Sequence, residues 1–311
     1  MSKLLTLTLL ASLSLYAQLN RGSITGVLSD STGAVIPTAK VTVKNLANGA
    51  VYETQTNSNG QFTTPNLPPG SYEVAFEAAS FKRLVRSGIE LGATEVARVD
   101  ASLEVGAVTE SVQITAEAEK LQTETPEVGT SLRNRELIDL PLSFGGARLA
   151  ENFAYKVSPG VSGSSWTSNI NGSTNYSKET LLDGATVTTY LSGHFGESSV
   201  SVEAIQQFKI QTSGMSAEFG RTQAGVFNYV MKSGANQIHG SVFGELRNEA
   251  LDANSFVNNS RGTPRALDRK QNYAFSFGGP VYVPKVYNGK NKSFFYASYE
   301  RYRERTVLRR A

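Results

Sequence analysis

The sequence predicts a mainly β protein with several parts along the chain. Short stretches in which apolar and polar residues alternate occur between residues 22 and 104 and again between residues 238 and 303. Gly, Asn, Asp and Pro separate these stretches, as expected for turns between strands. At 311 residues, of which 40% are hydrophobic, the chain is long enough for two or three domains with real cores.

The composition excludes several functional classes. The 30 basic and 27 acidic residues are spread along the chain, so no concentrated basic surface for nucleic acid is expected. The absence of cysteine excludes disulfides, thiol catalysis, cysteine-bound zinc and a lipoprotein anchor. The two histidines, His194 and His239, lie in separate segments, and no nucleophile or phosphate-loop motif is present. We therefore expect no catalytic residues, no metal site and no cofactor.

Residues 1–17 have the pattern of a secretory signal peptide. Lys3 gives the positive start, Leu4–Leu15 the apolar centre, and Ala17 a small residue before cleavage at Gln18. A membrane anchor helix is the alternative, but this apolar stretch is shorter than the roughly 20 residues that a span needs. The sequence therefore predicts an exported protein.

Residues 22–104 predict a small β-sandwich. Asp30–Gly33 and Asn57–Gly60 have the composition of tight turns, and Pro68–Gly70 ends one strand before the next begins. The expected strands are Ile24–Leu28, Lys40–Asn45, Tyr52–Thr56, Gly60–Thr64, Ser71–Glu77 and Ala97–Leu103.

This segment closely resembles the carboxypeptidase regulatory-like domain. The resemblance rests on the spacing of Gly26, Leu28, Asp30, Gly33, Pro37, Ala39, Val41 and Val43, and then of Thr56, Gly60, Phe62, Leu67, Pro68, Pro69, Gly70, Tyr72 and Val74. It implies a transthyretin-like sandwich without catalytic residues of its own, and no peptidase activity.

Residues 105–125 are polar and acidic and are interpreted as a linker. Within it, Glu110, Ser111, Val112, Gln113, Ile114, Thr115 and Ala116 form a short alternating strand for which no neighbouring strand is expected. Such a strand can add to the edge of a partner's sheet. Its position resembles that of the TonB box in TonB-dependent outer-membrane receptors, which implies a TonB-type energy-coupling protein as partner. The alternative is that it is the last strand of the sandwich.

Residues 126–237 resemble the plug domain of the same receptors. Arg135–Leu142 matches the plug's early helix and proline stop, Asn169–Gly172 and Thr180–Gly184 match its turns, and Val202–Ile210 matches its helix followed by a strand. The plug-motif residues that the resemblance implies are Asp183, Gly184, Glu203, Glu218, Gly220 and Arg221. We expect Asp183 to cap its own turn, and Glu218 and Arg221 to pair with each other or with lumen charges.

Residues 238–311 predict three amphipathic strands, Ile238–Leu246, Gln271–Val283 and Ser293–Arg303. Two-residue alternation with aromatics is what an outer-membrane β-barrel requires, although a soluble sandwich alternates equally well. A barrel of this receptor family needs many more strands, so we expect the chain to be an N-terminal fragment that is not transport-competent alone.

The predicted fold class is mainly β: an N-terminal transthyretin-like β-sandwich, an α+β plug domain, and the first strands of an incomplete outer-membrane β-barrel. The predicted function is that of an Oar-like TonB-dependent receptor or transporter in the outer membrane, in contact with outer-membrane lipid and a small or oligomeric substrate that the sequence does not identify. The alternative is a soluble periplasmic or secreted sandwich module that binds carbohydrate or protein.

Overall fold

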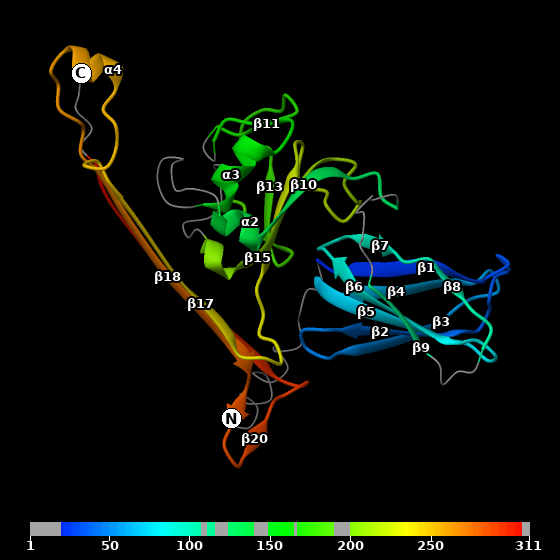
Figure 1. The fold of residues 1–311 in the computed structure, drawn as a ribbon. Helices are drawn as coiled ribbons and strands as arrows, with labels where there is room; N and C mark the ends of the chain where they lie inside the picture. The colour runs from blue at the N-terminus through cyan, green and yellow to red at the C-terminus, as the bar shows by residue number, and fades with distance from the viewer. Residues whose placement is uncertain are drawn as a thin grey trace, which may run out of the picture. The chain divides into compact units, whose positions relative to one another are not determined.

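The computed structural model describes residues 20–106, 124–139, 149–164, 167–189 and 200–306, and the backbone of residues 111–115. The predicted signal peptide, Glu110 and Ala116 lie outside the described residues. The described chain is mainly β, as the sequence predicts (Figure 1).

The N-terminal domain is a sandwich of two sheets. The first sheet has the order β4-β1-β7, and β8 pairs with the other end of β1. Its strands are β1 (Gly22–Asp30), β4 (Gln61–Leu67), β7 (Val96–Arg98) and β8 (Ala101–Leu103). The second sheet has the order β3-β2-β5-β6-β9. Its strands are β3 (Val51–Gln55), β2 (Lys40–Asn45), β5 (Gly70–Glu77), β6 (Arg83–Leu91) and β9 (Ser111–Thr115).

Alternate residues of these strands form one apolar core between the sheets. In β1, Ile24 and Leu28 are fully buried, and in β5 Tyr72, Val74 and Phe76 are fully buried. The Phe62 and Phe76 rings meet edge to face at 5.4 Å between centroids. This packing explains why the two-residue alternation in the sequence specifies the two sheets.

The turns have the side-chain chemistry that the sequence predicts. The Asp30 carboxylate accepts the backbone N–H groups of Thr32 and Ala34, at 2.8 and 2.9 Å. Asn57 Oδ1 accepts the N–H groups of Asn59 and Gln61, both at 2.9 Å. These bonds satisfy backbone donors that the tight turns leave without ladder partners.

Three details of the sandwich differ from expectation. The expected strand Ala97–Leu103 is divided into β7 and β8, which pair with successive parts of β1. Strand β6 was not expected, because its charged residues and a central glycine, Gly88 with φ +80°, hide the alternation. The expectation that Ser111–Thr115 has no neighbouring strand is wrong: it pairs in parallel with Arg83–Ser87 of β6.

The middle of the chain forms a five-stranded sheet with the order β10-β15-β16-β13-β14. Its strands are β10 (Val128–Arg133), β15 (Ile205–Ser213), β16 (Val226–Met231), β13 (Glu179–Leu182) and β14 (Ala185–Thr186). The same part of the chain contains two helices and a 3-10 turn, α2 (Asn134–Asp139), α3 (Ala150–Val157) and η2 (Val202–Ala204). It also contains a small hairpin of β11 (Val161–Ser162) and β12 (Asn169–Ile170). The Glu136 carboxylate accepts the N–H of Arg133 at 2.7 Å, a bond that caps α2.

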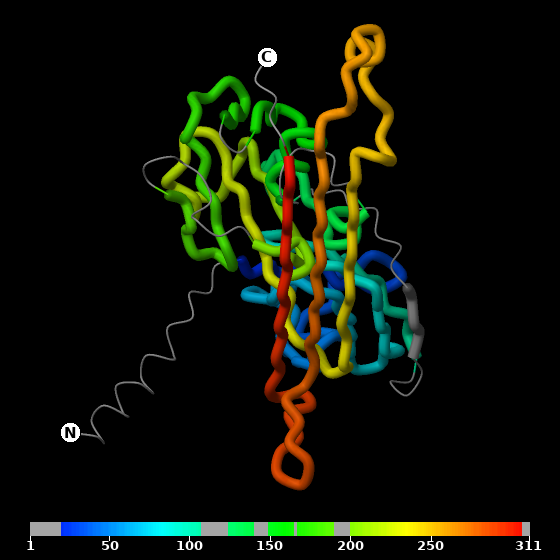
Figure 2. Tube along the Cα trace, turned by 90° about the vertical axis from the view of Figure 1, so that its left-hand side faces the viewer, coloured from blue at the N-terminus to red at the C-terminus, as the bar shows by residue number. Residues whose placement is uncertain are grey.

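The last part is a three-stranded antiparallel sheet with the order β17-β18-β21, whose long strands run side by side (Figure 2). Its strands are β17 (His239–Asn248), β18 (Asp268–Pro280) and β21 (Phe294–Thr306). The strands extend further than predicted at the charged end, and β18 stops at Pro280, which has no N–H for the ladder. The loop between β17 and β18 contains α4 (Phe256–Ser260), and the connection to β21 contains the small hairpin of β19 (Tyr282–Val283) and β20 (Tyr287–Asn288).

The helices in the described part of the chain are short. None of them has both the length and the apolar character that a transmembrane helix requires.

We expect Phe76→Ala to destabilise the sandwich by about 3–5 kcal/mol, because it removes a buried ring and leaves a cavity beside Phe62. Hydrogen exchange of β2 and β5 in the full chain would measure the change in local stability. Val51→Ala, on the exposed side of β3, is the matched control and should leave exchange unchanged. Equal exchange in Phe76→Ala and the parent would show that this face does not form the core.

Candidate functional site

The candidate site is the contact between η2 and one face of the β17-β18-β21 sheet. Val202, Glu203 and Ala204 of η2 are at most 2% exposed. The face that they meet has polar groups at alternate positions, including Ser241 in β17, Asn272 and Ser276 in β18, and Tyr296 and Glu300 in β21. Alternation places these side chains on one face and the large apolar side chains on the other.

Glu203 is the centre of this contact. Ser241 Oγ donates a hydrogen bond to Glu203 Oε2 at 2.9 Å, and lies 2.8 Å from Ser276 Oγ in the neighbouring strand. The Tyr296 hydroxyl donates to the backbone carbonyl of Glu203 at 2.9 Å. A carboxylate that is nearly fully buried therefore obtains polar partners from the sheet, as burial of a charge requires.

A second carboxylate, Glu300 of β21, joins the same contact from the side of the sheet. Ser201 Oγ donates to Glu300 Oε2, and Asn272 Nδ2 donates to Glu300 Oε1 at 2.6 Å. Residues 201–203 thus have hydrogen bonds to side chains of β17 and β21, and Glu300 connects them to β18.

Lys232, just after β16, adds a positive charge near Glu203. Burial lowers the pKa of Lys232, and the attraction of Glu203 opposes that change. The Lys232 N–H also donates to the Ala204 carbonyl at 2.8 Å, which fixes the end of η2. Polar and charged groups therefore make up much of this contact.

A second polar cluster lies between α3 and the β10-β15-β16-β13-β14 sheet. Lys178, which precedes β13, is 2% exposed and forms an ion pair with Glu151 of α3. Lys178 Nζ also donates to the Tyr155 hydroxyl at 2.9 Å, and the Tyr155 hydroxyl donates to Glu151 at 2.8 Å. The Phe227 ring lies 5.1 Å from Lys178 Nζ.

Burial lowers the pKa of Lys178 to about 7 and raises the pKa of Tyr155. A charged lysine in such a place depends on its carboxylate partner, because the desolvation of an ammonium group is costly. The Glu151–Lys178 pair therefore holds α3 against the sheet. Removal of either charge would leave the other one buried without a partner and would destabilise this packing.

The structure places the predicted site residues in different surroundings. Asp183 and Gly184 form the tight turn between β13 and β14, with φ of +46° and +83°, the conformation of a two-residue hairpin turn. Glu203 is in the contact described above. Glu218, Gly220 and Arg221 are exposed on the connection between β15 and β16 and take no part in the contact of Glu203. Ser111, Val112, Gln113, Ile114 and Thr115 form β9 at the edge of the sandwich.

Sequence reasoning missed most of the partners of Glu203. Ser241, Asn272, Ser276, Tyr296 and Glu300 are signalled only by polar side chains at alternate strand positions, which identifies a face but not what covers it. Glu151 and Tyr155 are four residues apart in α3, but nothing in the sequence connects them with Lys178, 27 positions after Glu151. Among the described residues no group of His, Asp or Glu side chains is arranged to hold a metal ion.

Comparison with known proteins gives two domain matches. Residues 23–104 match the carboxypeptidase regulatory-like domain, and residues 230–309 match an outer membrane beta barrel domain. The two matched segments coincide with the sandwich and with the part of the chain that contains β17, β18 and β21.

One curated protein is similar in sequence over most of this chain. The chain is a homologue of the TonB-dependent transporter Oar of Myxococcus xanthus, with 29% identity over 265 residues. The alignment covers 81% of this chain and 24% of Oar, so the chain spans about a quarter of the relative's length. The resemblance to Oar-like receptors that the sequence motifs indicated is confirmed.

The similar solved structures resemble only part of the chain. Wild-type catechol 1,2-dioxygenase of Acinetobacter radioresistens has 12% identity and a TM-score of 0.23, and the match covers 32% of this chain and 58% of the dioxygenase. The Bacillus anthracis TIE protein has 16% identity and a TM-score of 0.23, and the match covers 28% of this chain and 17% of the TIE protein. Likeness of this size has no bearing on function.

Glu203→Ala should increase hydrogen exchange in residues 201–205, because it removes the acceptor of Ser241 and breaks a buried polar contact worth about 1–3 kcal/mol. Mass-spectrometric hydrogen exchange of the full chain would measure this. Glu218→Ala, an exposed glutamate of the same domain, is the matched control. If both variants exchange like the parent, Glu203 does not hold η2 on the sheet.

Lys178→Met should destabilise the packing of α3 on the five-stranded sheet by about 3–5 kcal/mol, because it leaves the Glu151 carboxylate buried without its partner. The double variant Glu151→Leu/Lys178→Met should recover much of that loss. Denaturant unfolding, with Lys156→Met on the exposed end of α3 as control, would measure both effects. Additive losses in the double variant would contradict a coupled pair.

Proposed function

We propose that the chain acts in a TonB-dependent outer-membrane transporter, in which a plug controls the energised passage of a substrate through a barrel. The contact between η2 and the polar face of β17, β18 and β21 carries this proposal. In it, Glu203 lies against the sheet as a plug segment would lie against the inner wall. The homology to Oar supports the same function.

The chemistry of the contact suits a plug that must move. A hydrogen bond is worth about 0.5–1.5 kcal/mol between neutral groups and about 1.5–3 kcal/mol to a carboxylate, because water replaces it when it breaks. Ser241, Tyr296 and Glu300 can therefore release η2 in steps, as each hydrogen bond within the protein is exchanged for one with water. An apolar contact of the same size would oppose release of η2, because exposing its apolar surface to water costs free energy.

The opposite face of the sheet supports insertion in lipid. Val242 is 91% exposed, and Phe275, Phe277 and Tyr299 are also exposed on that face. A soluble module would gain nothing from such an apolar surface, whereas the outward face of a membrane barrel requires it. The proposed activity is transport and not catalysis.

Strand β9 is the proposed contact for a TonB-type coupling protein. It is the last strand in the order β3-β2-β5-β6-β9, so one of its edges faces away from β6. An edge strand offers backbone donors and acceptors to a strand from a partner. The partner would add to β9 or replace its pairing with β6.

Two neighbouring proline substitutions test this proposal. In an edge strand, successive N–H groups point alternately toward the paired strand and away from it, so Gln113→Pro and Ile114→Pro remove donors on opposite sides. We expect one variant to weaken the β6 pairing and the other to weaken binding of a purified periplasmic TonB domain. Binding by calorimetry and exchange of β6 would separate the two effects.

Ser102→Pro in β8 is a control for general damage to the sandwich, since β8 belongs to the other sheet. Equal binding of the TonB domain by the parent and both β9 variants would contradict coupling through this strand.

A further inference from the structure

The outward face of the β17-β18-β21 sheet changes character along its length. Its central part is an apolar belt formed by Val242, Leu246, Tyr273, Phe275, Phe277, Phe295 and Tyr299. Aromatic side chains from neighbouring strands lie against each other in this belt: Phe275 with Tyr299 at 5.5 Å, and Phe277 with Phe295 at 5.4 Å between ring centroids.

Toward the α4 loop the same face becomes basic. Opposite pairs in the register of β18 and β21 are Tyr273 with Arg301, Gln271 with Arg303, and Arg269 with Arg305. Because residues two apart share a face, Arg301, Arg303 and Arg305 lie on the face of Tyr299. We call Arg269, Arg301, Arg303 and Arg305 the arginine band.

Three residues of the arginine band, Arg269, Arg303 and Arg305, line a hollow. Arg269, Gln271, Arg303, Glu304 and Arg305 line a cavity of about 510 Å³ that is open on one side. The hollow is large enough for a small anionic group with bound water.

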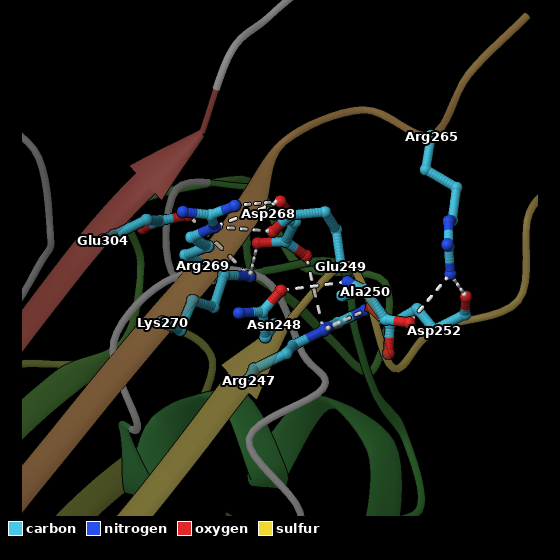
Figure 3. A network of polar contacts seen from close by, with 10 residues as sticks. All are labelled: Arg247, Asn248, Glu249, Ala250, Asp252, Arg265, Asp268, Arg269, Lys270 and Glu304. Atoms are coloured by element: carbon cyan, nitrogen blue, oxygen red, sulfur yellow. Dashed lines mark hydrogen bonds and ion pairs between the residues drawn. The ribbon is translucent and has the colours of Figure 1, made fainter.

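Within the described part of the chain, most of this positive charge has no counterion. Arg269 forms a bidentate ion pair with Glu249 at 2.7–3.0 Å (Figure 3). Among the described residues no ion pair engages Arg301, Arg303 or Arg305. Glu304 lines the hollow but lies 3.7 Å from Lys270 Nζ, which faces the other way in the alternation of β18.

Uncompensated arginines beside an apolar belt indicate an anionic partner at the membrane surface. Charged side chains on the lipid face of a barrel are unfavourable near the bilayer midplane but tolerated at the interface. Guanidinium groups bind phosphate in a bidentate manner. The band also lies at the end with the longer loop, 249–267 as against 281–293, which is the external end in barrels of this kind.

We propose that the arginine band binds the phosphate groups on the headgroup of an outer-leaflet lipid whose acyl chains cover the apolar belt. This inference rests on the proposed function, because it requires the outward face of the sheet to lie in the outer membrane. The belt and the band are continuous on β18 and β21, so one lipid molecule contacts both.

The test uses the full chain purified from outer membranes in detergent, with micelles that contain diphosphoryl lipid A as the probe. The variant Arg301→Gln/Arg303→Gln/Arg305→Gln should bind the probe roughly 100-fold more weakly, because each interfacial basic residue contributes about a fivefold factor. Native mass spectrometry of the lipid-bound fraction would measure the change.

The matched control is Lys285→Gln/Lys290→Gln/Lys292→Gln, which removes three exposed positive charges at the other end of the sheet and should bind like the parent. Dephosphorylated lipid A should bind the parent as weakly as diphosphoryl lipid A binds the arginine variant. Equal binding of both lipids, equal loss in the lysine control, or full competition by inorganic phosphate alone would each overturn the proposal. Absence of the parent chain from the outer-membrane fraction would instead contradict the proposed function.

Discussion

The alternation of side chains in β17, β18 and β21 is the constraint on which the function of this region depends. A strand has two faces, so each residue added to the ladder commits the next one to the opposite environment. Here one face presents Ser241, Ser276 and Glu300 to η2, and the other presents aromatic rings and arginines. A shift of register by one residue would exchange the two and would remove the contact with η2 and the apolar belt together.

Where the sequence predicts this fold well, local chemistry decides the outcome. The Asp30, Asn57 and Asp183-Gly184 turns are determined by side-chain acceptors or positive φ, and the strands that follow them are placed accordingly. The face of Phe76 in the core is likewise determined by alternation alone. The three long strands were found, but their charged ends were missed, because Asp268–Lys270 and Glu304–Thr306 pair across strands, which no single strand reveals.

The remainder depends on contacts between distant segments. Arg83, Arg86 and Gly88 interrupt the apolar alternation of β6, so the sequence does not predict this strand. It is recognised only from its pairing with β5 and β9. Of the candidate site, Glu203 was identified through its motif, whereas Tyr296 and Glu300 lie more than ninety positions further along the chain. The Glu151–Lys178 pair is a similar case. Neither residue stands out in the sequence, and only the fold shows that both are buried and paired beside the Phe227 ring.

The parallel pairing of β9 with β6 also has a mechanical consequence. Five register positions join the two strands, from Arg83 with Ser111 to Ser87 with Thr115. A pull along the strand axis loads all the connecting hydrogen bonds at once, whereas a pull across the axis opens them one after another from an end. The resistance of this segment to force therefore depends on the direction of the force, and β9 can yield to tension from one side while it withstands equal tension from another.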